Sequence, residues 1–339
     1  MSAVILPSQG VWEGEKRQLF LAPMSGVSEL PYRLLAKECG ADITITEFTS
    51  SSALTREVTK SWARVESHKD ESPFIPQIFG GNPEEMVQAA KMLDDEADII
   101  DLNFGCPAPK VTKICAGAAL MGQPDDLVEM SASIIENVQS PVTAKMRLGT
   151  GSGHHNVLEI SKRLEEIGVK RICVHGRTLN QKYRGEADWG TIAEVVEEVD
   201  IPVIANGDIV DTKSAKSCLE LTNAAGLMIG RGAIGRPNIF AEIKVGLGWE
   251  KEENLPWFNS KWFQYSDVEK QFTSRHWCWN RYIDIACETT GLRSNWLKRH
   301  AVAFTKGLPG AKKVRGILHL HQDSEKLADA ISKYLKSEN

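Results

Sequence analysis

A cysteine stands between a glycine and a proline within residues 103–120, which read NFGCPAPKVTKICAGAAL. This residue, Cys106, follows the apolar run DIIDL, so its thiol is expected at the end of a buried strand. A structural cysteine more often lies inside an apolar stretch, as Cys173 and Cys218 do. In a cleft, a thiol beside a bound heterocycle can act as a general acid or as a nucleophile. We therefore predict a catalytic role for Cys106 and a small core position for Cys115.

Lys145 lies inside another apolar run, PVTAKM. A buried ammonium group must be paired with an acid or face a ligand that develops negative charge. Reduced flavin is such a ligand, and an ion pair with Glu47 is the structural alternative. His175, in VHGRT, could hold a flavin carbonyl or phosphate or be a satisfied core histidine. Gln77, in FIPQIF, carries an amide able to pair with the edge of a heterocycle.

Two glycine-rich stretches, IANGDI and MIGRGAIGRP, each follow an apolar run late in the chain. Gly207, Gly230 and Gly232 would let the backbone approach a ligand closely, and a helix after the second stretch would direct its N–H groups at an anion. Ordinary glycine turns are the alternative for either stretch alone. Together they predict a phosphate site.

The elements that must position these residues repeat regularly. Eight short apolar runs occur in the first 230 residues: LFLAPM, ITITEF, FIPQIF, DIIDLNF, PVTAKM, RICVHG, PVIANG and GLMIG. Segments with helical spacing and capping signals lie between them, as in NPEEMVQAAKMLDDEA. Eight strand–helix units predict an α/β fold, the (β/α)8 TIM barrel, with an open doubly wound sheet as the alternative. The polar residues gather where the runs end, which in this barrel is the catalytic face.

The pattern changes after Gly248, where WEKEENLPWF is typical of a linker and the following residues are helical, aromatic and basic. We predict a catalytic barrel domain over residues 1–245 and an all-helical domain over residues 246–339. Although the net charge is −5, residues 251–339 carry fifteen Lys/Arg and ten Asp/Glu, and no acid lies between Thr289 and Gln322. This asymmetry favours a polyanion-binding surface over a solvated basic helix face.

Composition sets further limits. The seven cysteines contain no C-x-x-C pair, so the sequence predicts neither a disulfide framework nor a zinc site, and no metal. The first residues lack a signal-peptide pattern and no apolar window is long enough to span a membrane, so we expect a cytoplasmic protein that does not bind membranes. No pattern predicts an oligomeric state.

With these residues assembled, the chain closely resembles the tRNA-dihydrouridine synthases, flavoenzymes that reduce uridines in transfer RNA. The resemblance covers nearly the whole chain through motifs in family order: LAPMSGVSELPYR, NFGCPAPKVTKICAGAALM, KMRLG, HGRT, YRGEADW, IANGDI and GRGAIGRP. The stretch LKRHAVAFTKGLPGAKKVR is similar to the C-terminal helical domain that contacts RNA in this family.

The resemblance implies FMN as cofactor, NADPH or NADH as reductant and tRNA as partner. It implies that Cys106 protonates C5 of a uracil while hydride passes from flavin N5 to C6, and that Asn103 helps hold the base. The residues it places around FMN are Pro23, Met24, Gln77, Lys145, His175, Asn206, Gly207, Asp208, Gly230 and Arg231. Those it places toward the nucleotide or the RNA backbone are Arg147, Arg177, Tyr183 and Arg184, with Lys298, Arg299, Lys312 and Lys313 in the basic helical domain.

The chain also departs from the family pattern. TEF replaces the more usual Ser-Glu ending of the second strand, Cys115 is not part of the active-site signature, and the tryptophan-rich residues 246–280 match no family motif. Two other functions are compatible with some of the residues. A small-molecule FMN barrel acting on a free pyrimidine would explain the thiol but not the basic helical domain. An RNA-binding chaperone on an inactive barrel would not explain why Cys106, Lys145 and His175 occur together.

Overall fold

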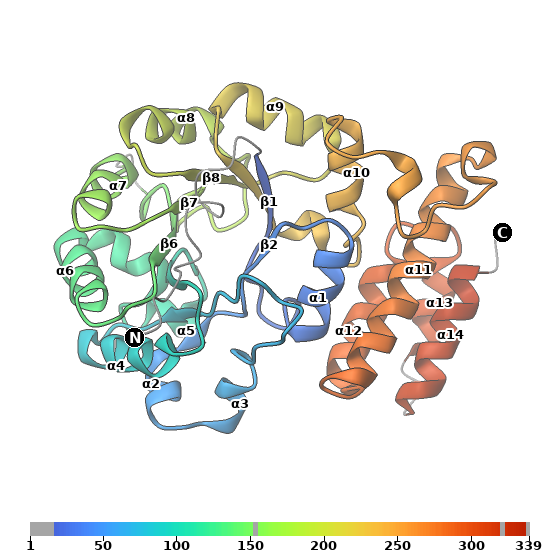
Figure 1. Cartoon of the computed structure of the whole chain (residues 1–339), viewed down its shortest axis with the longest axis horizontal. Helices are drawn as coiled ribbons and strands as arrows, with labels where there is room; N and C mark the ends of the chain where they lie inside the picture. The colour runs from blue at the N-terminus through green and yellow to red at the C-terminus, as the bar shows by residue number, and fades with distance from the viewer. Residues whose placement is uncertain (1–16, 152–154, 319–322, 337–339) are drawn as a thin grey trace, which may run out of the picture.

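The computed structural model describes residues 17–151, 155–318 and 323–336, and its first part is a parallel barrel surrounded by helices (Figure 1). The paired strands follow the order β2-β1-β9-β8-β7-β6-β5-β4-β3, and every pair is parallel. They are β1 (Gln18–Leu21), β2 (Ile43–Thr44), β3 (Thr49–Ser50), β4 (Gln77–Phe79), β5 (Ile100–Phe104), β6 (Val142–Arg147), β7 (Ile172–His175), β8 (Val203–Asn206) and β9 (Gly226–Ile229).

Strands β2 and β3 occupy one stretch, residues 43–50, and this stretch closes the barrel. Its first half pairs with β1 and its second half pairs with β4. Between the halves, the backbone N–H of Thr46 donates to the carbonyl of Ile75 at 3.1 Å. The sheet therefore closes through eight strand positions, which confirms the predicted (β/α)8 barrel over the open doubly wound sheet.

Helices cover the outside of the barrel (Figure 1). They are α1 (Leu30–Glu38), α2 (Ser51–Thr55), α3 (Thr59–Trp62), α4 (Pro83–Asp94), α5 (Pro109–Thr112), α6 (Pro124–Ile135), α7 (Val157–Glu166), α8 (Trp189–Glu198), α9 (Thr212–Thr222) and α10 (Ile239–Gly246), with 3-10 turns η1 (Gly117–Gly122) and η2 (Arg231–Ala233). Helix α4 begins where the sequence predicts, because Pro83 occupies the first turn and the Asn82 side chain accepts the Glu85 N–H at 2.8 Å. The second glycine-rich stretch contains the 3-10 turn η2, and helix α10 begins at Ile239 after it, so a helix follows this stretch as the sequence predicts.

The C-terminal region is helical, as predicted, and lies against one side of the barrel next to α1 and α10 (Figure 1). It contains α11 (Asp267–Glu288), α12 (Ser294–Thr305), α13 (Ala311–Ile317) and α14 (Ser324–Lys336). Buried polar groups join it to the barrel: Glu29, at the start of α1, accepts a hydrogen bond from the Tyr282 hydroxyl at 2.9 Å and lies 2.6 Å from His300 Nε2. The predicted division at residues 245/246 falls at the end of α10 and stays a prediction.

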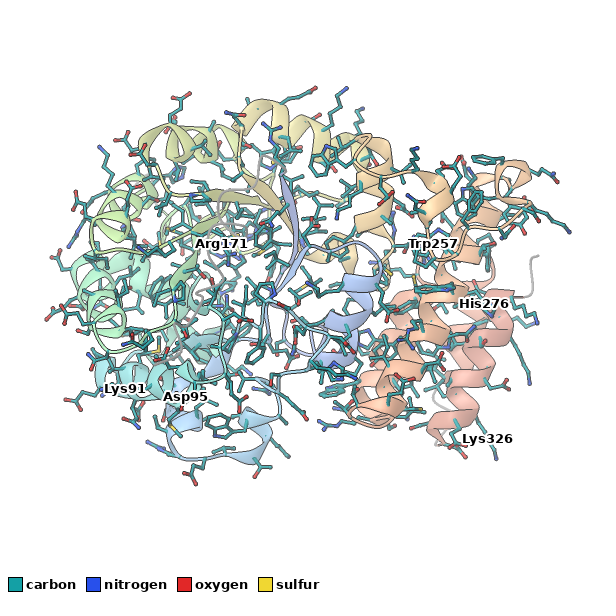
Figure 2. All side chains as sticks on the ribbon, in the orientation of Figure 1. Lys91, Asp95, Arg171, Trp257, His276 and Lys326 are labelled. Atoms are coloured by element: carbon teal, nitrogen blue, oxygen red, sulfur yellow. The ribbon has the colours of Figure 1, made fainter. Side chains whose placement is uncertain are left out.

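The tryptophan-rich segment packs against the helical region, so the expectation of a linker was wrong. Residues 249–266 contain the 3-10 turns η3 (Glu252–Asn254) and η4 (Trp262–Gln264). Trp257, labelled in Figure 2, and Trp262 are buried, and the Trp257 ring lies 5.8 Å from that of Trp277 in α11. The aromatic residues of this segment thus extend the core of the helical region.

Two absences hold for the described parts of the chain. None of their helices is long and apolar enough to cross a membrane. Their His, Cys, Asp and Glu side chains form no group of three or more that could hold a metal ion.

Candidate active site

A cavity of about 830 Å³ lies at the C-terminal ends of the barrel strands. The predicted site residues that line it are Pro23, Met24, Asn103, Cys106, Lys145, Arg147, His175, Tyr183, Asn206, Gly207, Asp208, Gly230 and Arg231. The predicted residues that do not line it are Gln77, Arg177, Arg184, Lys298, Arg299, Lys312 and Lys313. The structure therefore brings most of the predicted strand-end residues together in one site and leaves the four predicted basic residues of the helical region outside it.

The loop around Cys106 holds the thiol at the cavity wall. The carbonyl of Cys106 accepts the Ala118 N–H at 3.1 Å, and a Cβ added to Gly117 would lie 2.8 Å from that carbonyl oxygen. Gly117 also has a φ of 59°, so both the close approach and the backbone conformation require glycine. This explains why small residues follow the cysteine in the sequence.

The Cys106 side chain is 7% exposed, and burial raises the pKa of its thiol even though Arg147 and Lys145 lie nearby. The thiol is therefore protonated at neutral pH, which suits a proton donor better than a nucleophilic thiolate. Cys115 differs from the expected small core residue, because it is exposed and adopts a φ of 52° in the turn after α5. The KICAGAAL pattern led to the wrong environment since the buried positions begin only at Ala116.

A chain of buried side-chain amides supports the Cys106 loop. The Asn103 side-chain oxygen accepts the backbone N–H groups of Gly105, at 3.1 Å, and Cys106, at 2.9 Å. Its amide nitrogen donates to Gln77 Oε1 at 2.7 Å, and Gln77 Nε2 donates to Asp101 Oδ2 at 2.6 Å. Gln77 therefore contributes to the site in this structure through Asn103, from behind the cavity wall.

Lys145 of β6 and His175 of β7 both line the cavity. Lys145 Nζ donates to Asn206 Oδ1 at 3.1 Å, and burial lowers the pKa of this lysine. Glu47, the alternative partner, instead accepts the Gly26 N–H and lies 3.3 Å from Arg64 Nε. Burial, together with the nearby Lys145 and other cations, holds the pKa of His175 well below its usual value, so the ring is neutral at neutral pH.

Two arginines predicted to face the nucleotide are bound to the protein itself. Arg147 donates to the carbonyls of Gly105, Thr178 and Lys182 at 2.8–2.9 Å, which ties the Cys106 loop to the loop after β7. Arg177 forms a bidentate ion pair with Asp208, at 2.9 and 2.7 Å. Arg147 thus lines the cavity itself, and Arg177 holds Asp208, which lines it.

The exposed ring of Tyr183 lies at the cavity between the guanidinium groups of Arg231 and Arg147. Tyr183 is 53% exposed, and the guanidinium carbons of Arg231 and Arg147 lie 5.0 and 5.7 Å from its ring centroid. Arg184 instead lines a neighbouring hollow of about 490 Å³ on the other side of this loop. Lys312 and Lys313 line a third hollow, of about 950 Å³, on the helical region.

The lining residues that were not predicted as site residues include Phe48, Lys182 and Lys306. Phe48 directly follows Glu47 in the TEF sequence, where the chain departs from the family pattern. Its position after an expected strand was the feature that could have indicated a site residue. Lys306 reaches the cavity from the end of α12, where the buried Arg275 donates to its carbonyl at 2.7 Å. In the sequence, Lys306 was notable only as part of the stretch without acidic residues. That stretch does not by itself indicate that Lys306 reaches the barrel cavity.

Comparison with known proteins identifies the family of this chain. The family model described as Dihydrouridine synthase (Dus) matches residues 20–337. A probable tRNA-dihydrouridine synthase of Rickettsia bellii is 35% identical over 321 residues, which are 94% of this chain and 95% of that protein. The tRNA-dihydrouridine synthase B of Escherichia coli is 42% identical over 231 residues, 68% of this chain and 72% of that protein. A probable tRNA-dihydrouridine synthase of Rhodobacter capsulatus is 41% identical over 242 residues, 70% and 74% of the two chains. The chain belongs to the dihydrouridine synthase family.

Proposed function

We propose that this protein reduces the C5=C6 bond of specific uridines in tRNA to give dihydrouridine, with FMN as cofactor and NADPH or NADH as reductant. The observation that carries the proposal is the position of Cys106, a protonated thiol in the same cavity as Lys145, His175 and the glycine loops after β8 and β9. Membership of the dihydrouridine synthase family supports the substrate class, since the relatives named above are tRNA-dihydrouridine synthases.

The lining residues fit FMN. Lys145 is a buried cation whose hydrogen bond goes to a neutral amide oxygen, so its charge is available to an anionic ring edge. A Cβ added to Gly230 would lie 3.6 Å from Ala22 and 3.8 Å from Met24 Sδ, where it would narrow the cavity. Gly207 has a φ of 119° and lies beside His175. We assign the phosphate to the loops at Gly207 and Gly230, near Arg231.

FMN, when bound and reduced by NADPH or NADH, would supply a hydride to C6 of the uracil. Cys106 supplies the proton to C5, and its loop is held in place by Asn103 and Arg147. The exposed Tyr183 ring and the cations beside it are suited to a nucleotide that leaves the RNA stack, because aromatic and guanidinium planes stack on bases. Extracting a base costs a few kcal/mol, least in a flexible RNA loop.

The test is twofold. The purified full-length protein should carry or take up FMN without a covalent bond, and a structure of the complex should show the phosphate at Gly207 and Gly230. RNA from cells that lack the protein should lose dihydrouridine at defined tRNA positions and regain it when the protein is restored. A protein that takes up no FMN would instead support an RNA-binding chaperone, and one that reduces a free pyrimidine but does not bind tRNA would support a small-molecule enzyme.

A further inference from the structure

The loop after β1 forms one wall of the cavity and is held from both sides. Met24, Ser25 and Val27 line the cavity, and Gly26 lies between them. The Gly26 N–H donates to the Glu47 carboxylate, which is anchored by Arg64 at 3.3 Å. This carboxylate fixes the barrel side of the loop, which we call the 24–27 loop.

Arg299 of helix α12 fixes the other side. Its Nη1 donates to the Gly26 carbonyl at 2.7 Å and to the Ser25 carbonyl at 3.3 Å. A Cβ added to Gly26 would lie 1.3 Å from that same Nη1 atom, so the guanidinium occupies the space that the missing side chain leaves. Gly26 also has a φ of 70°, a conformation that glycine adopts at little cost.

Helix α12 is itself docked rigidly on the barrel, so Arg299 is a fixed anchor. One residue on, His300 is buried, pairs with Glu29 at 2.6 Å and stacks on the Tyr32 ring with centroids 4.8 Å apart. Near the end of the helix, the backbone of Ala303 packs so closely on Gly235 that a Cβ there would lie 2.2 Å from the Ala303 carbonyl carbon. The helix therefore contacts both the 24–27 loop and the loop that follows β9.

We propose that Arg299 is a positioning residue for the cofactor: it holds the 24–27 loop in its cavity-lining conformation, so FMN affinity depends on helix α12 even without RNA. This inference rests on the proposed FMN site. It assigns to Arg299 a contact within the protein in addition to the RNA contact predicted from its charge.

The test measures the Kd for FMN binding to the full-length apoprotein in the absence of RNA. Quenching of flavin fluorescence reports the binding. Arg299→Ala should raise the Kd roughly three- to tenfold, the range expected for losing hydrogen bonds to two carbonyls. Arg299→Lys should recover part of the affinity, because an ammonium group can still reach one carbonyl. The control is Lys326→Ala. Lys326, labelled in Figure 2, lies in α14, and removing its charge should leave the Kd for FMN unchanged.

A double-mutant cycle makes the test specific to this contact. Gly26→Ala should expel the guanidinium and weaken FMN binding, and adding Arg299→Ala to it should cost little more. Additive effects, or an unchanged Kd for Arg299→Ala at temperatures where the variant is folded, would overturn the inference while leaving the proposed function intact. If the unmodified protein itself fails to bind FMN, the proposed function fails and this inference with it.

Discussion

The side-chain oxygen of Asn103 accepts the backbone N–H of Cys106 at 2.9 Å. Asn103 lies in β5 and Cys106 follows the end of that strand, so β5 sets the position of the thiol. Arg147 adds a second tie through the carbonyl of Gly105. A reactive group on this short, doubly anchored loop has little freedom to move, which is what a directed proton transfer requires.

We expect Cys106→Ala to keep FMN and to accept hydride from NADPH, yet to make little dihydrouridine. Losing a positioned general acid typically lowers the rate by about 10² to 10⁴. Cys106→Ser should recover little activity, because a hydroxyl is a much weaker acid than a thiol. The measurement is single-turnover reoxidation of the reduced enzyme by tRNA.

The matched control is Cys115→Ala, which removes an exposed thiol from the same loop and should stay active. Equal reoxidation rates for the parent protein and Cys106→Ala would exclude this thiol as the proton source.

The pH dependence of that step follows from the raised pKa of Cys106. The reaction needs the protonated thiol, which is present below this pKa and is lost as the pH rises through it. Since burial moves the pKa above the usual thiol range, reoxidation by tRNA should stay constant through neutral pH and fall only in alkaline solution. A rate that rises with pH across the thiol range would instead indicate a reactive thiolate.

Lys145→Ala should impair flavin reduction or turnover far more than it destabilises the fold. The ammonium group is buried at an energetic cost and its hydrogen bond goes to the neutral Asn206 amide, so its removal relieves that cost while taking a cation from the cavity. Flavin reduction kinetics and thermal unfolding should be measured on the same preparation. Unfolding of the variant with normal flavin behaviour in the folded fraction would assign Lys145 a structural role.

Charge reversal at Lys298, Lys312 and Lys313, together with Arg299, should weaken tRNA binding and flatten its salt dependence. Cations that contact phosphates release counterions, so each lost contact reduces the slope of log affinity against log salt by about 0.7 to 0.9. Filter binding over a range of salt concentrations measures this slope. An unchanged slope would place these residues on a solvated face without RNA contacts.

Tyr282→Phe should lower the free energy of unfolding by about 1–3 kcal/mol, because Glu29 would lose a buried hydrogen bond at the contact between α1 and α11. Tyr183→Phe is a suitable comparison, since that ring is half exposed and its change should leave unfolding nearly unaffected. Denaturant unfolding of both variants would show whether the Glu29 contact stabilises the fold.

The sequence predicted the barrel and the strand-end residues because both depend on local pattern. His175 and Asn206 end apolar runs and Lys145 lies near the end of another, and parallel strands bring such positions to one face whatever the details of packing. The bonds these side chains make are set by contacts between distant segments. Arg147 and Arg177 were placed toward the nucleotide by their motifs, but their partners lie on neighbouring loops whose conformation no local pattern specifies.

In the helical region, too, the local pattern predicted the elements but not the contacts between distant segments. Its helices and its basic charge were evident in the sequence. The burial of Trp257 depends on packing against α11, and the approach of Lys306 to the cavity depends on how the helical region docks on the barrel. Docking depends on single positions such as Gly235, where only the absence of a side chain lets Ala303 come near. A single sequence cannot reveal that Gly235 is needed for docking, because a glycine after a strand can occur for many structural reasons.

The cavity is walled by residues from both ends of the chain, and this sets an order of events during synthesis. Strand β1 pairs with β9, so the barrel can close only after residue 229 has left the ribosome. Helix α12 begins about 65 residues later, and Lys306 directly follows that helix. A nascent barrel therefore presents an incomplete pocket until helix α12 has emerged and docked on it.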